Sequence, residues 1–162
     1  MSKSFIGIDV SKNSLDVHIL PEDVSLSYRY ETKPMKALIK KLKTYAPELV
    51  VLEATGGYEI IVGIALADAG LPVAIVNPRQ VRDYARALGI LAKTDKIDAY
   101  VIARFAQDVK PEARGQMTFK ELELKSLVVR RQQLVEMRSA EVNRLSRTTI
   151  PQVKNGIQKI IR

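Results

Sequence analysis

The sequence has no cysteine, no tryptophan and a single histidine among its 162 residues. Without cysteine there is no disulfide, thiolate zinc site or thiol nucleophile, and one imidazole leaves no second one for a zinc site or proton relay. Any bound metal would then have oxygen ligands, which Mg²⁺ and Mn²⁺ prefer. The sequence also lacks the roughly 18-residue apolar run of a membrane span and the layout of a secretory signal. We therefore expect a cytoplasmic protein that does not contact a membrane.

The charge is positive and unevenly distributed. There are 26 basic and 18 acidic residues, a formal net charge of +8. The net charge is −1 over residues 1–78, +3 over 79–118 and +6 over 119–162. Such an excess suits a phosphate backbone, because each neutralised phosphate releases counterions. A solvated helix surface with no partner would show the same excess.

Five segments have the patterns of strands. Phe5–Val10, Leu15–Leu20 and Ser25–Glu31 are short and apolar or alternating, which predicts an antiparallel meander. Leu49–Leu52 and Val73–Val76 are short continuous apolar runs, which are typical of buried parallel strands.

Helical spacing separates and follows these strands. It runs from Met35 to Tyr45, after Gly56-Gly57 to Gly70, from Pro78 to Gly89, and from Asp95 to Asp108 behind the N-cap candidate Thr94. The order predicts an α/β fold, in which a mixed sheet is flanked by helices.

Phe119–Arg147 contains no glycine or proline, which predicts a long helix ended by Pro151. Apolar pairs at 127/128 and 134/135 repeat after seven residues, as in a coiled coil. Packing back on the globular part is the alternative. We therefore expect one domain over 1–110 and a long C-terminal, coiled-coil-like helical arm over 111–162, and we expect the natural protein to continue beyond the arm.

Four carboxylates occupy unusual positions. Asp9 lies inside the first apolar strand, Glu53 ends a buried strand, and Asp95 and Asp98 share one helical face. Carboxylates that converge repel one another unless a divalent cation lies among them, so the pattern predicts one or two Mg²⁺ ions, with Mn²⁺ as substitute. Two such ions can assist an in-line phosphoryl displacement. The alternatives are ordinary helix N-terminal acids and, for Glu53, an arginine partner.

Three segments around these acids resemble one family. FIGIDVSKNSLDV, VVLEATGGYE and VNPRQVRDYARALGILAKTDKIDA are similar to segments of the DEDD insertion-sequence transposases of the IS-one-ten type and of the Piv/MooV-type DNA invertases. The resemblance covers about residues 4–108, in the family's order and at similar separations.

This resemblance implies a RuvC-like, ribonuclease-H-type fold with Asp9, Glu53, Asp95 and Asp98 as catalytic Mg²⁺ ligands. It also implies DNA recombination by a homo-oligomer, a dimer or tetramer, guided by a structured bridge RNA. In such enzymes a C-terminal domain supplies a serine that becomes joined to DNA. Only the N-terminal catalytic domain and the start of the arm resemble this chain.

Basic side chains near the acids and along the arm are candidates for nucleic-acid contacts. They are Lys12, Arg79, Arg82, Arg86, Lys93, Lys96, Arg130, Arg131 and Arg138. Asp83 could instead pair with Arg79 or Arg86 on a salt-bridged surface. The Gly56-Gly57 pair fits a plain turn better than a phosphate cradle, and His18 fits an ordinary strand residue.

Two other functions are compatible with parts of the pattern. An ATP-handling domain of the actin and sugar-kinase type also opens with an IGID-like strand and a hairpin, but its hairpin brings Gly and Thr or Ser to the phosphates. This chain has Ser11-Lys12-Asn13 there. A non-catalytic module that binds nucleic acid and oligomerises through the long helix is the stronger alternative.

Overall fold

A computed structural model describes residues 3–54, 56–90, 95–113, 115 and 118–161. The chain divides into two compact units, Met1–Met117 and Thr118–Arg162, and each is described by itself. The predicted boundary after residue 110 falls at the end of a helix, and the first unit continues to Met117.

A five-stranded mixed sheet forms the centre of the first unit, in the order β3-β2-β1-β4-β5. β1, β2 and β3 form an antiparallel meander, and β4 and β5 run parallel to β1. All five predicted strands are present. The strands are β1 (Phe5–Val10), β2 (Ser14–Leu20), β3 (Val24–Arg29), β4 (Leu49–Glu53) and β5 (Val73–Val76). β3 ends two residues earlier than predicted because Glu31 is already the N-cap of the next helix.

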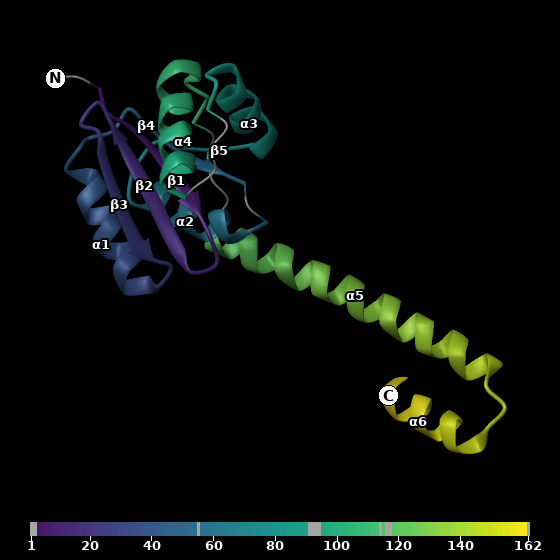
Figure 1. Cartoon of the computed structure of the whole chain (residues 1–162). Coiled ribbons are helices and arrows are strands. Elements are labelled where there is room, and N and C mark those ends of the chain that lie inside the picture. Colours follow the sequence, from purple (N-terminus) through teal and green to yellow (C-terminus); the bar gives the residue numbers. More distant parts are fainter. Residues whose placement is uncertain (1–2, 55, 91–94, 114, 116–117, 162) are drawn as a thin grey trace. The chain divides into compact units, whose positions relative to one another are not determined.

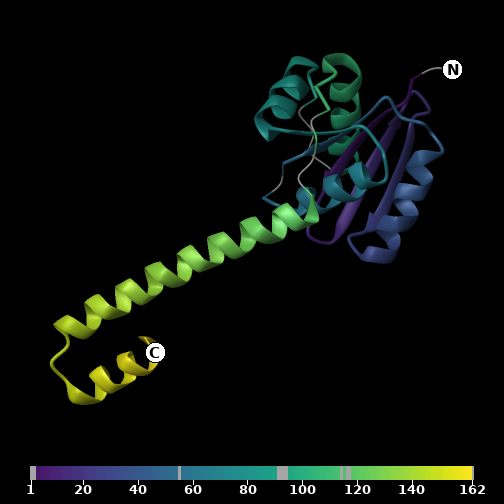
Figure 2. The ribbon, with the colours of Figure 1, turned by 180° about the vertical axis from the view of Figure 1, so that it is seen from behind.

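Helices cover both faces of the sheet (Figure 1, and from behind in Figure 2). They are α1 (Thr32–Lys43), α2 (Tyr58–Asp68), α3 (Pro78–Ala87) and α4 (Asp95–Val109). α1 and α2 pack on one face, and α3 and α4 pack on the other. α1 begins two residues before Pro34, whose missing N–H costs little in a first turn because N–H groups there have no helical partner. This is the predicted α/β fold, in which a mixed sheet is flanked by helices.

Strand alternation assigns each side chain of β1 to one of two cores. Ile6, Ile8 and Val10 belong to the core under α1 and α2. Phe5 belongs to the core under α3 and α4. Because successive side chains point to opposite faces, the α3/α4 face also receives Gly7 and Asp9.

Gly7 lets α4 pack directly against the backbone of β1. A Cβ placed on Gly7 would lie 2.2 Å from the backbone N of Ala103 and 2.4 Å from the carbonyl O of Ala99. Both atoms belong to a helix backbone, which cannot move aside as a flexible side chain can. The sequence position of Gly7, inside an apolar strand, therefore reflects this close approach.

The second unit consists of α5 (Phe119–Arg147) and α6 (Pro151–Ile161). α5 has the predicted bounds and begins with a capping box, in which Thr118 and Glu121 satisfy each other's backbone N–H groups. α5 ends at Arg147, before Pro151 as predicted, and Pro151 starts α6, a helix that the sequence pattern did not predict. No helix in the described part of the chain is long and apolar enough to cross a membrane.

We expect Gly7→Ala to destabilise the first unit by about 3 kcal/mol or more, because the added methyl overlaps backbone atoms of α4. Urea unfolding followed by circular dichroism measures this loss. Gly156→Ala is the matched control, since nothing lies within 4 Å of its added Cβ. In helix α6 that change should stabilise by about 1 kcal/mol. A Gly7→Ala variant as stable as wild type would contradict the close packing.

Candidate active site

Three carboxylates lie on one line across the sheet, at the carboxyl end of β1. Asp9 is paired with Asp16 of β2. Glu53 of β4 follows Leu52, which is paired with Ile8, so it stands beside Asp9 one residue further along. Alternation places all three on the α3/α4 face of the sheet.

The N-terminal turn of α4 lies over the same end of β1. Lys110, just after α4, has its Nζ 5.4 Å from the centre of the Phe5 ring, at the start of β1. The backbone of Ala99 lies against Gly7, in the middle of the strand. The helix therefore runs antiparallel to β1, and its first turn comes next to Asp9.

That first turn carries the other two predicted acids. Asp98 is half-buried there, and Asp95 is the first residue of α4. The side chain of Asp95 lies outside the described part of the structure. The fold thus brings the backbone positions of all four acids to one end of the sheet, from three separate segments.

The carboxylates are partly withdrawn from water and interact with their surroundings. Asp9, Glu53 and Asp98 are each half-buried and each has a polar or electrostatic partner. Asp16 accepts a 2.8 Å hydrogen bond from the hydroxyl of Ser14. Among the side chains that the structure describes, no three acids or histidines are grouped closely enough to hold a metal ion as they stand.

The alternation of Leu15, Val17 and Ile19 predicted a shared face of β2 but no role for Asp16. The hairpin between β1 and β2 contains the feature that places Asp16. Ser11 and Ser14 close a two-residue turn with a 2.9 Å backbone hydrogen bond. This turn fixes the register, so that Asp16 must lie opposite Asp9. Directly opposed like charges destabilise a strand pair by a few tenths of a kcal/mol or more, which makes this pair unusual.

The basic residues that were predicted to lie near the acids belong to the hairpin turn after β1, to α3 and to the segment around Asp95. Lys12 is exposed in the hairpin turn after β1. α3 follows the carboxyl end of β5. The exposed Arg79 therefore lies at the end of the sheet that carries the acids, and Arg82 lies about one helical turn further along α3. Lys93 lies outside the described residues, as does the side chain of Lys96.

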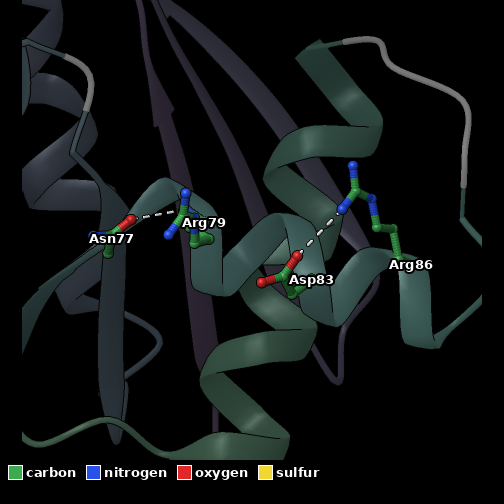
Figure 3. Close-up of polar contacts among 4 residues, drawn as sticks. All are labelled: Asn77, Arg79, Asp83 and Arg86. Atoms are coloured by element: carbon green, nitrogen blue, oxygen red, sulfur yellow. Dashed lines mark hydrogen bonds and ion pairs between the residues drawn. The ribbon is translucent and has the colours of Figure 1, made fainter.

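The polar contacts of α3 explain part of its arginine pattern (Figure 3). Asn77 caps the helix, and its Oδ1 accepts a 2.8 Å hydrogen bond from the backbone N–H of Arg79. Arg86 pairs with Asp83 at 3.4 Å on the exposed surface, which confirms the salt-bridge alternative for that arginine. The described structure shows no such pair for the side chains of Arg79 and Arg82.

Three more candidate arginines lie on α5. Arg130, Arg131 and Arg138 are exposed, and they line a shallow hollow together with Leu127 and its apolar neighbours. At 100° per residue Arg131 and Arg138 fall inside the apolar stripe of the helix. They are therefore surrounded by exposed aliphatic side chains.

The Gly56-Gly57 pair forms a turn, as expected. Both residues have positive φ, 82° and 112°, which glycine adopts without strain. The backbone N–H of Gly57 donates to the Glu59 carboxylate at 2.9 Å. Because the chain's own carboxylate occupies this helix N-terminus, the turn does not present that N–H to a phosphate.

His18 holds together β2, β3 and α4. It is buried, on the face opposite Val17, as its position in the alternation predicted. Its Nδ1 is 2.9 Å from the Ser25 hydroxyl and its Nε2 is 3.2 Å from the Asp23 carboxylate. Its ring also makes an edge contact with Tyr100 of α4, with centroids 5.0 Å apart. His18 therefore acts as a structural link, as the sequence analysis expected.

Burial lowers the pKa of His18 below its ordinary value, and the nearby Asp23 carboxylate offsets this only in part. The unfolded chain then takes up a proton before the folded one as the pH falls, so stability should decrease as the pH drops below about 6.5. Urea midpoints from about pH 7.5 to about pH 6 measure this effect. His18→Gln should remove that part of the slope. Because the chain has one histidine, an unchanged slope would contradict the assignment.

Comparison with known proteins identifies the family. The family model for DEDD transposases of the IS110 type, described as a transposase, matches residues 6–149. Pilin gene-inverting proteins of Moraxella lacunata and Moraxella bovis are each 30% identical over 152 residues, with 87% of this chain and 47% of each relative covered. The chain therefore spans about half the length of the curated relatives it matches.

Two solved structures are similar to the chain. RuvC of T. thermophilus, solved in complex with a Holliday junction substrate, has a TM-score of 0.47 at 17% identity and covers 67% of this chain and 96% of its own. The ROK hexokinase from Thermus thermophilus has a TM-score of 0.39 at 15% identity, and the match covers 57% of this chain and 39% of the hexokinase chain. The family match confirms the resemblance carried by the three segments around the acids. By that match, the chain belongs to the family of DEDD transposases of the IS110 type.

Proposed function

We propose that this chain is the catalytic domain of a DNA transposase or site-specific recombinase, which carries out Mg²⁺-dependent phosphoryl transfer on DNA. The observation that carries the proposal is the line of Asp9, Glu53 and Asp16 across the sheet, next to the first turn of α4. Membership of a transposase family supports the same reaction class. In this proposal residues 1–110 are the catalytic part and residues 111–162 the arm.

The donor set fits a hard divalent cation. Asp9, Glu53, Asp95 and Asp98 are all carboxylates, the ligands that Mg²⁺ and Mn²⁺ accept, and the chain has no cysteine. Its one histidine, His18, contacts Ser25 and Asp23. When bound, one or two such ions would stabilise the negative charge on the attacking and leaving oxygens. The two strands hold Asp9 and Glu53 in fixed register, and the first turn of α4 lies next to them.

The basic residues beside the acids would contact the phosphates of the DNA backbone. Lys12 and Arg79 lie at the same end of the sheet as the acids, and Arg82 continues along the exposed side of α3. Lysine and arginine at such positions fix the register of a phosphate backbone but do not read sequence. Lys93 and Lys96, which flank Asp95 in the sequence, are proposed as further phosphate contacts.

We propose further that a structured guide RNA and a serine from a second domain complete the reaction. The net charge of +6 over residues 119–162, with Arg130, Arg131 and Arg138 on α5, supports a nucleic-acid contact on the arm. The curated relatives are about twice as long as the matched region, which leaves room for the second domain.

A Mn²⁺ titration by calorimetry tests the metal site directly, without requiring DNA cleavage. We expect saturable binding to the wild-type chain and binding weaker by about tenfold or more in Asp9→Asn and in Asp98→Asn, because each variant removes an anionic ligand. Asp68→Asn is the matched control. It removes one exposed carboxylate at the end of α2, away from the acids, and should leave the affinity unchanged.

Folding of each variant is checked by circular dichroism. If Mn²⁺ does not bind to the chain alone or to its complex with DNA, the four acids do not form a metal site. The non-catalytic nucleic-acid-binding module would then be the better description. Equal losses in Asp68→Asn and Asp9→Asn would also contradict the proposal, because they would reflect net charge and not ligation.

The arm supports the homo-oligomer that the family resemblance implies. None of the 29 residues of α5 is buried. Its exposed apolar side chains include Leu124, Leu127, Val128, Leu134, Val135 and Val142. A contiguous apolar stripe of this kind marks a protein interaction surface. A second copy of α5 fits the stripe, and the arginines within it would lower the stability of the pair and help to choose its register.

We expect the chain to self-associate reversibly and Leu127→Lys/Leu134→Lys to shift it toward monomer, since two more charges would enter the stripe. Sedimentation equilibrium over a range of concentrations measures the shift. Gln133→Lys/Ala140→Lys adds the same charge at the same seven-residue spacing on the side of α5 opposite the stripe, where both residues are exposed, and should leave association unchanged. A wild-type chain that stays monomeric at all concentrations would contradict self-association through the arm.

A further inference from the structure

Helix α1 concentrates positive charge on a part of the chain that is otherwise poor in it. Its twelve residues include five lysines and no acid. Residues 1–78 contain eight basic residues in all, and the other three are Lys3, Lys12 and Arg29. The five lysines, all exposed, are Lys33, Lys36, Lys40, Lys41 and Lys43.

Four of these lysines form one stripe along the helix. At 100° per residue Lys33, Lys36, Lys40 and Lys43 fall within about 80° of one another, opposite the buried Leu38 and Leu42. The stripe is about 15 Å long at 1.5 Å per residue. Lys41 points to another side, with its Nζ 5.5 Å from the centre of the Tyr45 ring. We call the four residues the lysine stripe.

The lysine stripe works against the stability of its own helix. Its members are neighbours at spacings of three and four residues, and each like-charge pair destabilises a helix by a few tenths of a kcal/mol. Lys33 also lies in the first turn, where the helix dipole disfavours a cation. In the described structure no carboxylate pairs with any of the four. Helix stability therefore does not account for the stripe.

The lysine stripe is separate from the acidic site. α1 packs through Leu38 and Leu42 on the core that also holds Ile8, whereas Asp9 and its neighbours are on the other face of the sheet. Figures 1 and 2 show α1 and α4 on opposite sides of the sheet. A nucleic-acid segment that reached the acids along α3 would not reach these lysines on the same path.

We propose that the lysine stripe binds the phosphate backbone of a DNA duplex, separately from the DNA at the acids. A straight row of four uncompensated cations about 15 Å long matches the edge of a duplex, which carries a negative charge every ~1.7 Å of its axis. The choice of DNA rests on the proposed function, since recombination brings more than one DNA segment to the enzyme. With lysine contacts to phosphates alone, the binding is independent of sequence.

Fluorescence anisotropy with a labelled duplex of arbitrary sequence tests this contact. The full chain carrying Asp9→Asn is titrated in EDTA, so that neither metal nor reaction contributes. Replacing all four stripe lysines with glutamine should weaken binding by about tenfold or more at ~100 mM salt. The slope of log affinity against log salt should become less steep by about 3 to 4, close to 0.9 for each lost phosphate contact.

Lys40→Gln and Lys41→Gln form a matched pair on the same helix with the same change in charge. We expect Lys40→Gln to weaken DNA binding and Lys41→Gln to leave it nearly unchanged. Equal losses in the pair would show a general charge effect and overturn the proposal, as would wild-type affinity and slope in the four-lysine variant. Tighter binding of a structured RNA through the same lysines would assign the stripe to RNA and overturn it too.

This experiment and the metal titration can fail independently. Mn²⁺ binding at the acids does not involve the lysine stripe, and DNA binding in EDTA does not involve the metal. A chain that binds Mn²⁺ through Asp9 but shows no dependence on the stripe would keep the proposed function and lose only the second DNA contact.

Discussion

The contact between α4 and β1 at Gly7 determines where the candidate site residues of the first unit lie. Only a residue without a Cβ lets the carbonyl of Ala99 and the N–H of Ala103 approach the strand so closely. The contact fixes both the height of the helix above the sheet and its position along β1. As a result the first turn of α4, with its two acids, comes next to Asp9. A larger residue at position 7 would separate the helix from the sheet before any ligand could bind.

The sheet supplies the second constraint, which is register. The tight hairpin after β1 sets Asp16 opposite Asp9, and the parallel pairing of β4 sets Glu53 beside it. The paired strands thus hold the carboxylates next to one another in a row. In a flexible loop, their mutual repulsion would move them apart. Such a row costs stability in the absence of a cation, as the unpaired lysines of α1 do on the opposite face. Stability accounts for neither arrangement, and both fit the charged ligands that we propose, a metal ion on one face and phosphates on the other.

Much of the fold could be predicted from the sequence because its signals are local. The strands at Phe5–Val10 and Val73–Val76, and the long helix at Phe119–Arg147, have the predicted bounds. Hydrophobic periodicity and proline positions depend only on neighbouring residues. The start of α1 was predicted too late, and the short helix α6 was not predicted. In both cases proline lies in the first turn of the helix, where it favours a helix start, although elsewhere it stops a helix.

By itself, the sequence determined the types of side chain available and the family. Without cysteine, any bound metal would have no thiolate ligand, and the segments around Asp9, Glu53 and Asp98 identify the family of DEDD transposases. Only the tertiary structure decided which residues share a face and a register. It brought Asp16 to the acids and placed the lysine stripe of α1 on the other side of the sheet. These outcomes depend on strand pairing and on one close helix contact, which join residues far apart in the chain and which no local pattern specifies.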